Sequence, residues 1–242
     1  MIVWEDEALI LSYQDYSETS IILKILTKSY GVRKGLIRGA KSKKKNYIYE
    51  SGNIISVSYK ARTEDMLGIF SVDIIRSCSA IYLTDSLKFS GIISILNMIE
   101  FCLLDNEVEK DLYCYSKGLI NKIISSDVTW LSDYVLWEIF LLKKIGFGLE
   151  LSKCVLTNQT NNLKFVSPKS GCAVSQKVAE KWKKRLFILP EFLLSEKNAK
   201  LQDIINGLKI TTNFLKKFSI SINKTLPFTR EDFIDRILKK KF

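Results

Sequence analysis

Residues 28–45 have the sequence KSYGVRKGLIRGAKSKKK. This segment contains eight Lys or Arg and no carboxylate, and Gly31, Gly35 and Gly39 recur in it at every fourth position. Glycine within a strand pattern marks a bulge, a bend or the close approach of another backbone. After Ala40 the apolar residues stop and lysines follow. We therefore predict a bent, basic strand that runs into a basic loop.

A surface of this kind suits a polyanion, because each Lys or Arg that neutralises a phosphate releases condensed counterions. A solvated lysine face without a ligand has the same composition and remains the alternative. The charge of the whole chain is +11, divided as +3 over residues 1–80, −4 over 81–150 and +12 over 151–242. Two basic ends around an acidic middle indicate more than one functional surface.

Short β-branched and aliphatic segments surround the basic strand, with partial period-two alternation and turn residues between them. We predict strands at Ala8–Tyr13, Ser20–Thr27, Val32–Arg38, Ile54–Arg62 and Met66–Ile75. Five short strands in fewer than eighty residues predict a small antiparallel barrel, for which the five-stranded OB-fold is the simplest arrangement. An SH3-like barrel has the same pattern and stays open.

From Thr84 the apolar residues follow a helical period, behind a Thr84–Asp85 cap. Three helices are expected between there and Gly146, followed by a loop-rich segment at 150–175. A further helix is expected through Val178, Trp182 and Leu186, and two more near Leu201–Phe218 and Arg230–Lys240. The predicted class is α+β, with an OB-fold nucleic-acid-binding domain at 1–80 and a helical domain at 81–242. Residues 150–175 form its ribbon-like insert.

The sequence lacks the residue types and spacings that most catalytic and metal-binding sites use. The chain has no histidine, which removes the commonest general base and metal ligand. Cys154 and Cys172 bracket a loop as in a zinc ribbon, but Thr157 and Ser175 stand three residues after them, and a structural zinc needs four ligands. The segment from Gly35 to Ser42 has phosphate-loop spacing, except that an alanine replaces the second glycine. We expect no enzyme, no metal and no cofactor.

The longest uncharged apolar run, Phe89–Ile99, is too short to span a bilayer. The acidic N-terminal residues do not resemble a signal peptide, and an odd number of cysteines favours free thiols. We therefore expect a cytoplasmic protein, associated with the nucleoid if its polyanion is DNA.

Several segments resemble the RecO family, the bacterial recombination mediators of the gap-repair pathway. They are ALILSYQDYSETSIILKILTKSYG near the N-terminus, RGAKSKKK at Arg38–Lys45, LLKKIGFGLELSKC from Leu141, FVSPKSGCAVS at Phe165–Ser175 and LPEFL at Leu189–Leu193. The match lies in the order and spacing of these segments, and it covers most of the chain. The last fifty residues match only in being helical.

The resemblance implies an OB-fold, a helical middle and a C-terminal zinc ribbon that only some members carry. One of the four ribbon ligands survives here, at Cys154, which implies the zinc-free branch. The resemblance also implies that the protein binds single- and double-stranded DNA, anneals complementary strands, and acts with RecR and single-strand-binding protein to load RecA. It implies no enzymatic activity.

DNA contacts carried over from the family fall on Arg38, Lys41, Lys43, Lys44 and Lys45. The charge pattern adds Arg33, Lys34 and Lys60, and the aromatic interleaving adds Tyr59. The tyrosines that flank the strand either stack on bases or pack inside the barrel. An RNA-binding OB protein has the same charges and aromatics, and a protein-interaction scaffold is the second alternative.

The resemblance further implies docking of the acidic, apolar tail of single-strand-binding protein. Such a tail needs an apolar pocket beside cations. The end of the third helix offers Lys143 and Lys144 directly before Phe147 and Leu149. The alternative is that both lysines only oppose the helix dipole while Phe147 packs inward.

Overall fold

The computed structural model describes residues 1–42, 46–63, 66–125, 129–180, 182–195 and 198–239. The chain forms two compact units. The first contains residues 1–125 and the last helix, and the second contains residues 129–226. The predicted boundary at residue 80 separates strands from helices, and independent folding of 1–80 and 81–242 remains a prediction.

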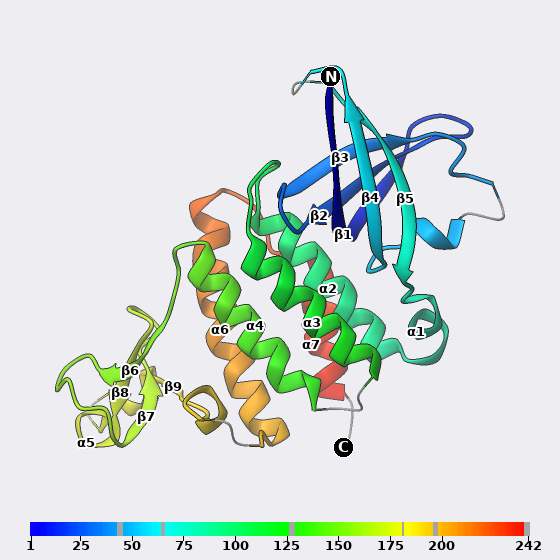
Figure 1. Ribbon diagram of the computed structural model, residues 1–242. Helices are drawn as coiled ribbons and strands as arrows, with labels where there is room; N and C mark the ends of the chain where they lie inside the picture. Colours follow the sequence, from blue (N-terminus) through cyan, green and yellow to red (C-terminus); the bar gives the residue numbers. More distant parts are fainter. Residues whose placement is uncertain (43–45, 64–65, 126–128, 181, 196–197, 240–242) are drawn as a thin grey trace. The chain divides into compact units, whose positions relative to one another are not determined.

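A five-stranded closed barrel forms the start of the first unit (Figure 1). Its strand order is β1-β2-β3-β5-β4, with β3 and β5 parallel and all other neighbours antiparallel. This arrangement is the OB-fold, and all five predicted strands are confirmed. They are β1 (Ile2–Asp15), β2 (Ile21–Thr27), β3 (Val32–Ile37), β4 (Ile54–Ala61) and β5 (Gly68–Arg76).

β1 starts six residues before its predicted beginning, because its early acidic residues point away from the core. The Glu5 carboxylate accepts a hydrogen bond from Ser58 Oγ at 3.0 Å, and Asp6 accepts one from the Ser29 N–H at 2.6 Å. β1 is long enough to pair with both β2 and β4, which closes the barrel.

An aromatic cluster fills part of the barrel interior. The Trp4 ring stacks between the rings of Tyr30 and Tyr59, at centroid distances of 4.4 and 4.7 Å. Phe70 lies edge-on to Trp4 at 6.3 Å. The apolar residues of β2 and β4 that alternate inward complete this core. The period-two pattern of the sequence therefore places the correct face of each strand inside.

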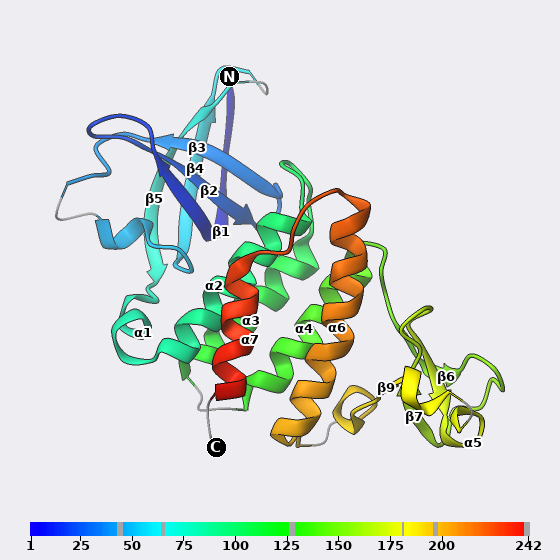
Figure 2. The same cartoon turned by 180° about the vertical axis from the view of Figure 1, so that it is seen from behind.

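Four helices complete the first unit: α1 (Ser79–Thr84), α2 (Ser86–Cys102), α3 (Lys110–Ser125) and α7 (Phe228–Lys239). The predicted cap is confirmed, since the Asp85 carboxylate accepts from the N–H groups of Leu87 and Lys88 at 3.0 Å. α7 runs beside α2, as Figure 2 shows, and Asn97 donates a hydrogen bond to Thr229 Oγ1 at 2.9 Å. β1 contacts α2 and β2 contacts α3, so helices cover one outer side of the barrel.

The second unit is built on α4 (Trp130–Lys144) and α6 (Leu201–Ser221), which pack together. Between their inner faces the buried Glu138 carboxylate accepts hydrogen bonds from Tyr134 at 3.1 Å and Thr211 at 2.5 Å. α4 ends where predicted. Gly146 has φ of +81°, and the N–H groups of Gly146 and Phe147 bond back into the last turn.

A small sheet with order β6-β8-β7-β9 forms the ribbon-like insert of the second unit. Its strands are β6 (Glu150–Cys154), β7 (Leu163–Val166), β8 (Cys172–Ser175) and β9 (Phe187–Ile188). The helix predicted through Leu186 is wrong. α5 (Gln176–Ala179) is one turn long and is followed by the 3-10 turn η2 (Lys183–Arg185), because Phe187 and Ile188 pair with β7 at the sheet edge.

Two further 3-10 turns are η1 (Asn46–Tyr49) and η3 (Glu191–Leu193). No helix among the described residues has the length and apolar content needed to cross a membrane. All five cysteines are free thiols.

Candidate nucleic-acid interface

The outer face of β3 carries the basic strand identified in the sequence. Alternation along β3 turns Lys34 and Leu36 outward, while Gly35 and Ile37 face the core. Arg38 directly follows the strand and is exposed. Leu36 lies opposite Ile69 of β5, and Ile69 lies opposite Lys60 of β4. Lys60 is exposed and belongs to the same outer row, so the barrel brings these separate cations onto one surface. We call this surface, defined by Lys34, Leu36, Arg38, Lys60 and Ile69 and extended by Lys41 after the strand, the β3 face.

Two of the predicted cations are held by carboxylates. Lys34 Nζ lies 2.6 Å from an Asp105 oxygen, and Lys41 Nζ lies 3.0 Å from an Asp15 oxygen. The Lys34 and Asp105 side chains are nearly half exposed, and such pairs contribute only about 0–1 kcal/mol. A phosphate can therefore replace these carboxylates at little cost. Arg38 is exposed and forms no ion pair with any described residue.

Two residues predicted to contact DNA lie elsewhere. Tyr59 is only 6% exposed, with its ring stacked on Trp4, so it has no free face for a base. Ser58 and Lys60, its neighbours on β4, lie on the outer side of the strand, so the alternation of β4 turns Tyr59 inward. Arg33 points away from the β3 face and donates from Nε to the carbonyl of Tyr30 at 2.8 Å. We leave both out of the interface.

Three exposed tyrosines lie at the end of the barrel next to this face. Tyr13, Tyr16 and Tyr47 are 54%, 62% and 50% exposed, and Tyr47 is one of the tyrosines that flank the basic segment in the sequence. The Lys41 N–H reaches the Thr19 carbonyl at 3.4 Å, which places residues 38–42 beside the β1–β2 turn. Figures 1 and 2 show this turn and η1 on the same side of the barrel. The missed signal was the position of Tyr16 in the first turn of an OB-fold, a turn that binds oligonucleotides.

A small cavity of about 330 Å³ opens at this end of the barrel. Its lining residues are Tyr13, Asp15, Ile21, Ala40, Lys41, Tyr49 and Glu50. Tyr49 is buried, so the cavity lining offers a ligand one aromatic ring, that of Tyr13, and one cation, Lys41. The predicted DNA contacts at Lys43, Lys44 and Lys45 lie outside the described residues.

A polar cluster surrounds Cys154, the last residue of β6 in the ribbon. The fully buried Cys154 Sγ accepts a hydrogen bond from the Ser175 N–H at 3.3 Å. Burial opposes ionisation of this thiol, but hydrogen bonds from the Thr157 side chain and the Ser175 backbone outweigh it and lower the pKa to about 6. In the described parts of the chain, no three His, Cys, Asp or Glu side chains converge as metal ligands do. Hydrogen bonds thus surround the Cys154 thiol within the small sheet.

The predicted docking residues lie at the end of α4. Lys143 is exposed, and Lys144 Nζ lies 5.5 Å from the centre of the Phe140 ring. Phe147 is half-buried, with its ring edge-on to Phe218 at 5.7 Å. Leu149 is also half-buried. The apolar groups thus pack partly inward and leave part of each side chain at the surface beside the lysines.

Two family models match this chain. Residues 1–78 match "Recombination protein O N terminal", and residues 83–217 match "Recombination protein O C terminal". The chain belongs to the RecO family. The first RecO model covers the barrel up to the start of the helices, and the second ends inside α6, before α7.

Curated RecO proteins align with nearly the whole chain. The DNA repair protein RecO of Dinoroseobacter shibae is 35% identical over 237 residues, which cover 97% of this chain and 98% of the relative. RecO of Ruegeria sp. is 32% identical over 98% of this chain and 99% of its own length. RecO of Rhodospirillum rubrum is 30% identical over 98% and 97%, respectively. Membership of RecO makes this a protein of DNA repair and recombination.

Proposed function

We propose that this RecO-family protein is a recombination mediator that binds single- and double-stranded DNA through the β3 face of its barrel. The supporting observation is the outer row of cations on β3 and β4, which ends beside three exposed tyrosines. Cations bind the phosphates and tyrosines stack on unpaired bases, a combination that tolerates any sequence. Duplex DNA engages the cations alone.

Strand annealing follows from this chemistry without a catalytic step. Neutralised phosphates repel a complementary strand less, and bases held on tyrosines stay unpaired until they meet it. We propose that the protein anneals complementary strands in this way and acts with RecR and single-strand-binding protein to load RecA onto DNA.

The test is a gel-shift comparison of single-stranded DNA, duplex DNA and RNA with wild type and Arg38→Glu/Lys41→Glu. The variant should bind single-stranded DNA at least tenfold more weakly. The control is Lys88→Glu/Lys110→Glu, which makes the same charge change in the first turns of α2 and α3, where carboxylates are tolerated. Equal losses in both variants would remove the β3 face from the site. Tighter binding of RNA than of DNA would favour the RNA-binding alternative.

For single-strand-binding protein we propose the α4 end, formed by Lys143, Lys144, Phe147 and Leu149. The exposed Lys143 ammonium suits the acidic part of its tail, and the half-buried Phe147 and Leu149 suit the apolar part. Fluorescence anisotropy with a labelled tail peptide should show weaker binding by Lys143→Glu/Lys144→Glu. Equal affinity, with an unchanged circular dichroism spectrum, would exclude these lysines.

A further inference from the structure

Trp182 differs from the other tryptophans of the chain. Trp4, Trp130 and Trp137 are at most 8% exposed, whereas Trp182 is 48% exposed. It was expected on the apolar stripe of a helix, but that helix does not form. No described residue makes a ring contact with it. Tryptophan is usually well buried in a folded protein, so an exposed one indicates a surface where something binds.

Three consecutive cations follow Trp182. Lys183, Lys184 and Arg185 form the turn η2 and are all exposed. The Arg185 N–H bonds to the Trp182 carbonyl at 2.7 Å, and the Trp182 N–H bonds to the Ala179 carbonyl at 2.9 Å. The backbone of the turn is thus fixed while its charged ends stay available. None of the three cations pairs with a carboxylate of the described residues.

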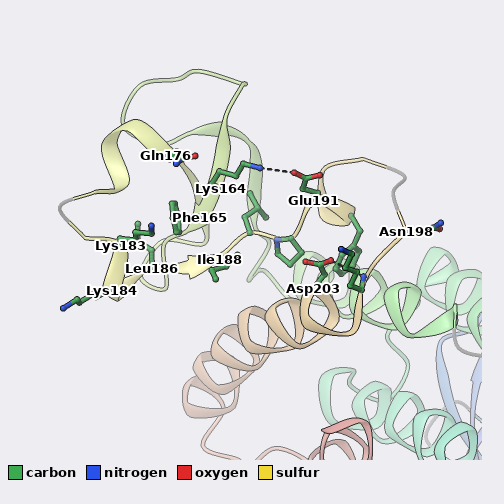
Figure 3. Close-up of a pocket in the computed structure, with 14 residues that line it drawn as sticks. Lys164, Phe165, Gln176, Lys183, Lys184, Leu186, Ile188, Glu191, Asn198 and Asp203 are labelled. Atoms are coloured by element: carbon green, nitrogen blue, oxygen red, sulfur yellow. Dashed lines mark hydrogen bonds and ion pairs between the residues drawn. The ribbon is translucent and has the colours of Figure 1, made fainter. Parts of the chain in front are cut away.

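A cavity of about 870 Å³ adjoins this turn within the second unit (Figure 3). Its size is that of a site for a small organic molecule. Apolar residues form much of its wall, namely Phe165, Leu186, Ile188, Leu189, Pro190 and Phe192. Ile188 is 56% exposed, so part of this wall is open to solvent.

The charged groups of the cavity leave it basic. The Glu191 carboxylate is paired with Lys164 Nζ at 3.0 Å, the contact drawn as a dashed line in Figure 3. The Asp203 carboxylate caps α6 by accepting from the Lys200 N–H at 3.1 Å. Both carboxylates in the lining are therefore engaged, one in an ion pair and one in a helix cap. Lys183, Lys184 and Lys200 retain ammonium groups that form no ion pair with the described residues.

We propose that Trp182, η2 and this cavity form a second binding site for single-stranded nucleic acid. Trp182 stacks on one base, the cations of η2 and Lys200 bind the phosphates, and the cavity receives a neighbouring base against its apolar wall. This inference rests on the proposed DNA-binding function and adds a second site to it.

The observations favour a nucleic-acid strand over an acidic peptide. An acidic peptide uses the cavity and its lysines but has no need of a large flat ring outside the lining. A single strand uses both, because it carries bases that stack on Trp182 next to phosphates that the three following cations can bind. Two single-strand sites on one chain also give annealing a simple basis, since each site holds one strand.

Tryptophan fluorescence gives a direct reading of this site. Because Trp182 is the one exposed tryptophan of the four, acrylamide quenches mainly its emission. Binding of an unlabelled dT oligonucleotide of about eight nucleotides, within the length that one OB-fold covers, should shield Trp182 from acrylamide. The shielding should persist in Arg38→Glu/Lys41→Glu, because the barrel site is separate. Trp182→Phe should remove the accessible emission and keep much of the affinity.

Stoichiometry gives the second reading. At low salt the wild-type chain should bind two labelled oligonucleotides per chain, and Trp182→Ala/Lys183→Glu/Lys184→Glu should bind one. Trp182→Ala alone should weaken the second site about 5- to 150-fold, the range for loss of one stacked base. The matched control is Lys153→Glu/Lys169→Glu, which changes two exposed lysines outside the cavity lining and should still bind two.

One oligonucleotide per wild-type chain, lost in Arg38→Glu/Lys41→Glu and without shielding of Trp182, would overturn this inference and leave the proposed function intact. Binding of an acidic, aromatic peptide at Trp182 with no effect of the oligonucleotide would assign the cavity to a protein partner and also overturn it. No binding of any oligonucleotide by wild type would overturn the proposed function itself.

Discussion

Gly35 and Gly68 lie opposite each other where β3 pairs with β5 and closes the barrel. A Cβ atom on Gly35 would lie 2.5 Å from the Phe70 ring, and one on Gly68 would lie 2.2 Å from the Tyr59 ring. The aromatic cluster therefore fills the space that side chains would take at these two positions. Of the glycines in the basic segment, Gly35 is the one that shapes the barrel core.

Gly35→Ala should lower the free energy of unfolding by about 1–3 kcal/mol, the usual cost of overpacking a core. Its φ is not positive, so the cost is steric. Urea denaturation measures the change. The control is Gly118→Ala, in the open on α3, which should be neutral or stabilise by about 0.5–1 kcal/mol. A Gly35→Ala midpoint equal to wild type would show that the ring has room to move.

Glu7 joins β1 to α3 by accepting hydrogen bonds from the Tyr113 hydroxyl and the Lys117 ammonium. Burial of the Glu7 carboxyl opposes its ionisation, but these bonds outweigh that effect and lower its pKa below the usual value. A carboxyl with a lowered folded-state pKa stabilises the fold above its unfolded pKa of about 4.3, and the contribution disappears as the pH falls through the folded value.

Glu7→Gln should therefore destabilise the first unit at pH 7 by about 1 kcal/mol, a modest loss because the pair is about one-third exposed. The difference from wild type should shrink as the pH falls below about 4. Thermal unfolding at a series of pH values measures it. A difference that does not vary with pH would mean that lost packing, and not the charge, causes the destabilisation.

At the scale of elements, the sequence predicts best where one period dominates. Ile55, Val57 and Tyr59 alternate with polar residues, and β4 follows that pattern. Trp182 and Leu186 have helical spacing, but pairing of the next two residues with β7 prevails over it. That contact crosses more than twenty residues of chain, so local pattern does not reveal it. Local pattern also does not reveal that Tyr16 is exposed, because this depends on how the barrel closes. It does not reveal which outward residues lie beside Lys60, because this depends on the register between strands.

The ribbon should fold without zinc. Its cluster of Cys154, Thr157 and Ser175 supplies one thiolate ligand and otherwise hydrogen bonds. Metal analysis of protein purified without added zinc should give far less than one equivalent, and a chelator should leave the melting temperature unchanged. Stoichiometric zinc would mean that ligands come from elsewhere in the chain or from a second chain.

For the whole molecule, the distribution of charge indicates candidate nucleic-acid surfaces that the fold alone does not indicate. The barrel region carries +3 and the last 92 residues carry +12, so net charge alone would place nucleic acid at the C-terminal end. The β3 face is nevertheless the surface where cations and exposed aromatics meet on an OB-fold. The turn at Trp182 is the corresponding combination in the second unit. Clustering, and not the total charge, indicates both surfaces.

The salt dependence of binding tests the β3 face most directly. Affinity for single-stranded DNA is measured over a range of salt concentrations for wild type, Arg38→Glu/Lys41→Glu and the control Lys88→Glu/Lys110→Glu. Each phosphate contact contributes about −0.7 to the log–log slope for a single strand. Loss of two contacts should make the slope of Arg38→Glu/Lys41→Glu shallower by about 1.4 and weaken binding of every sequence alike, while the control keeps the wild-type slope. A slope equal to wild type in Arg38→Glu/Lys41→Glu would contradict DNA binding by the β3 face.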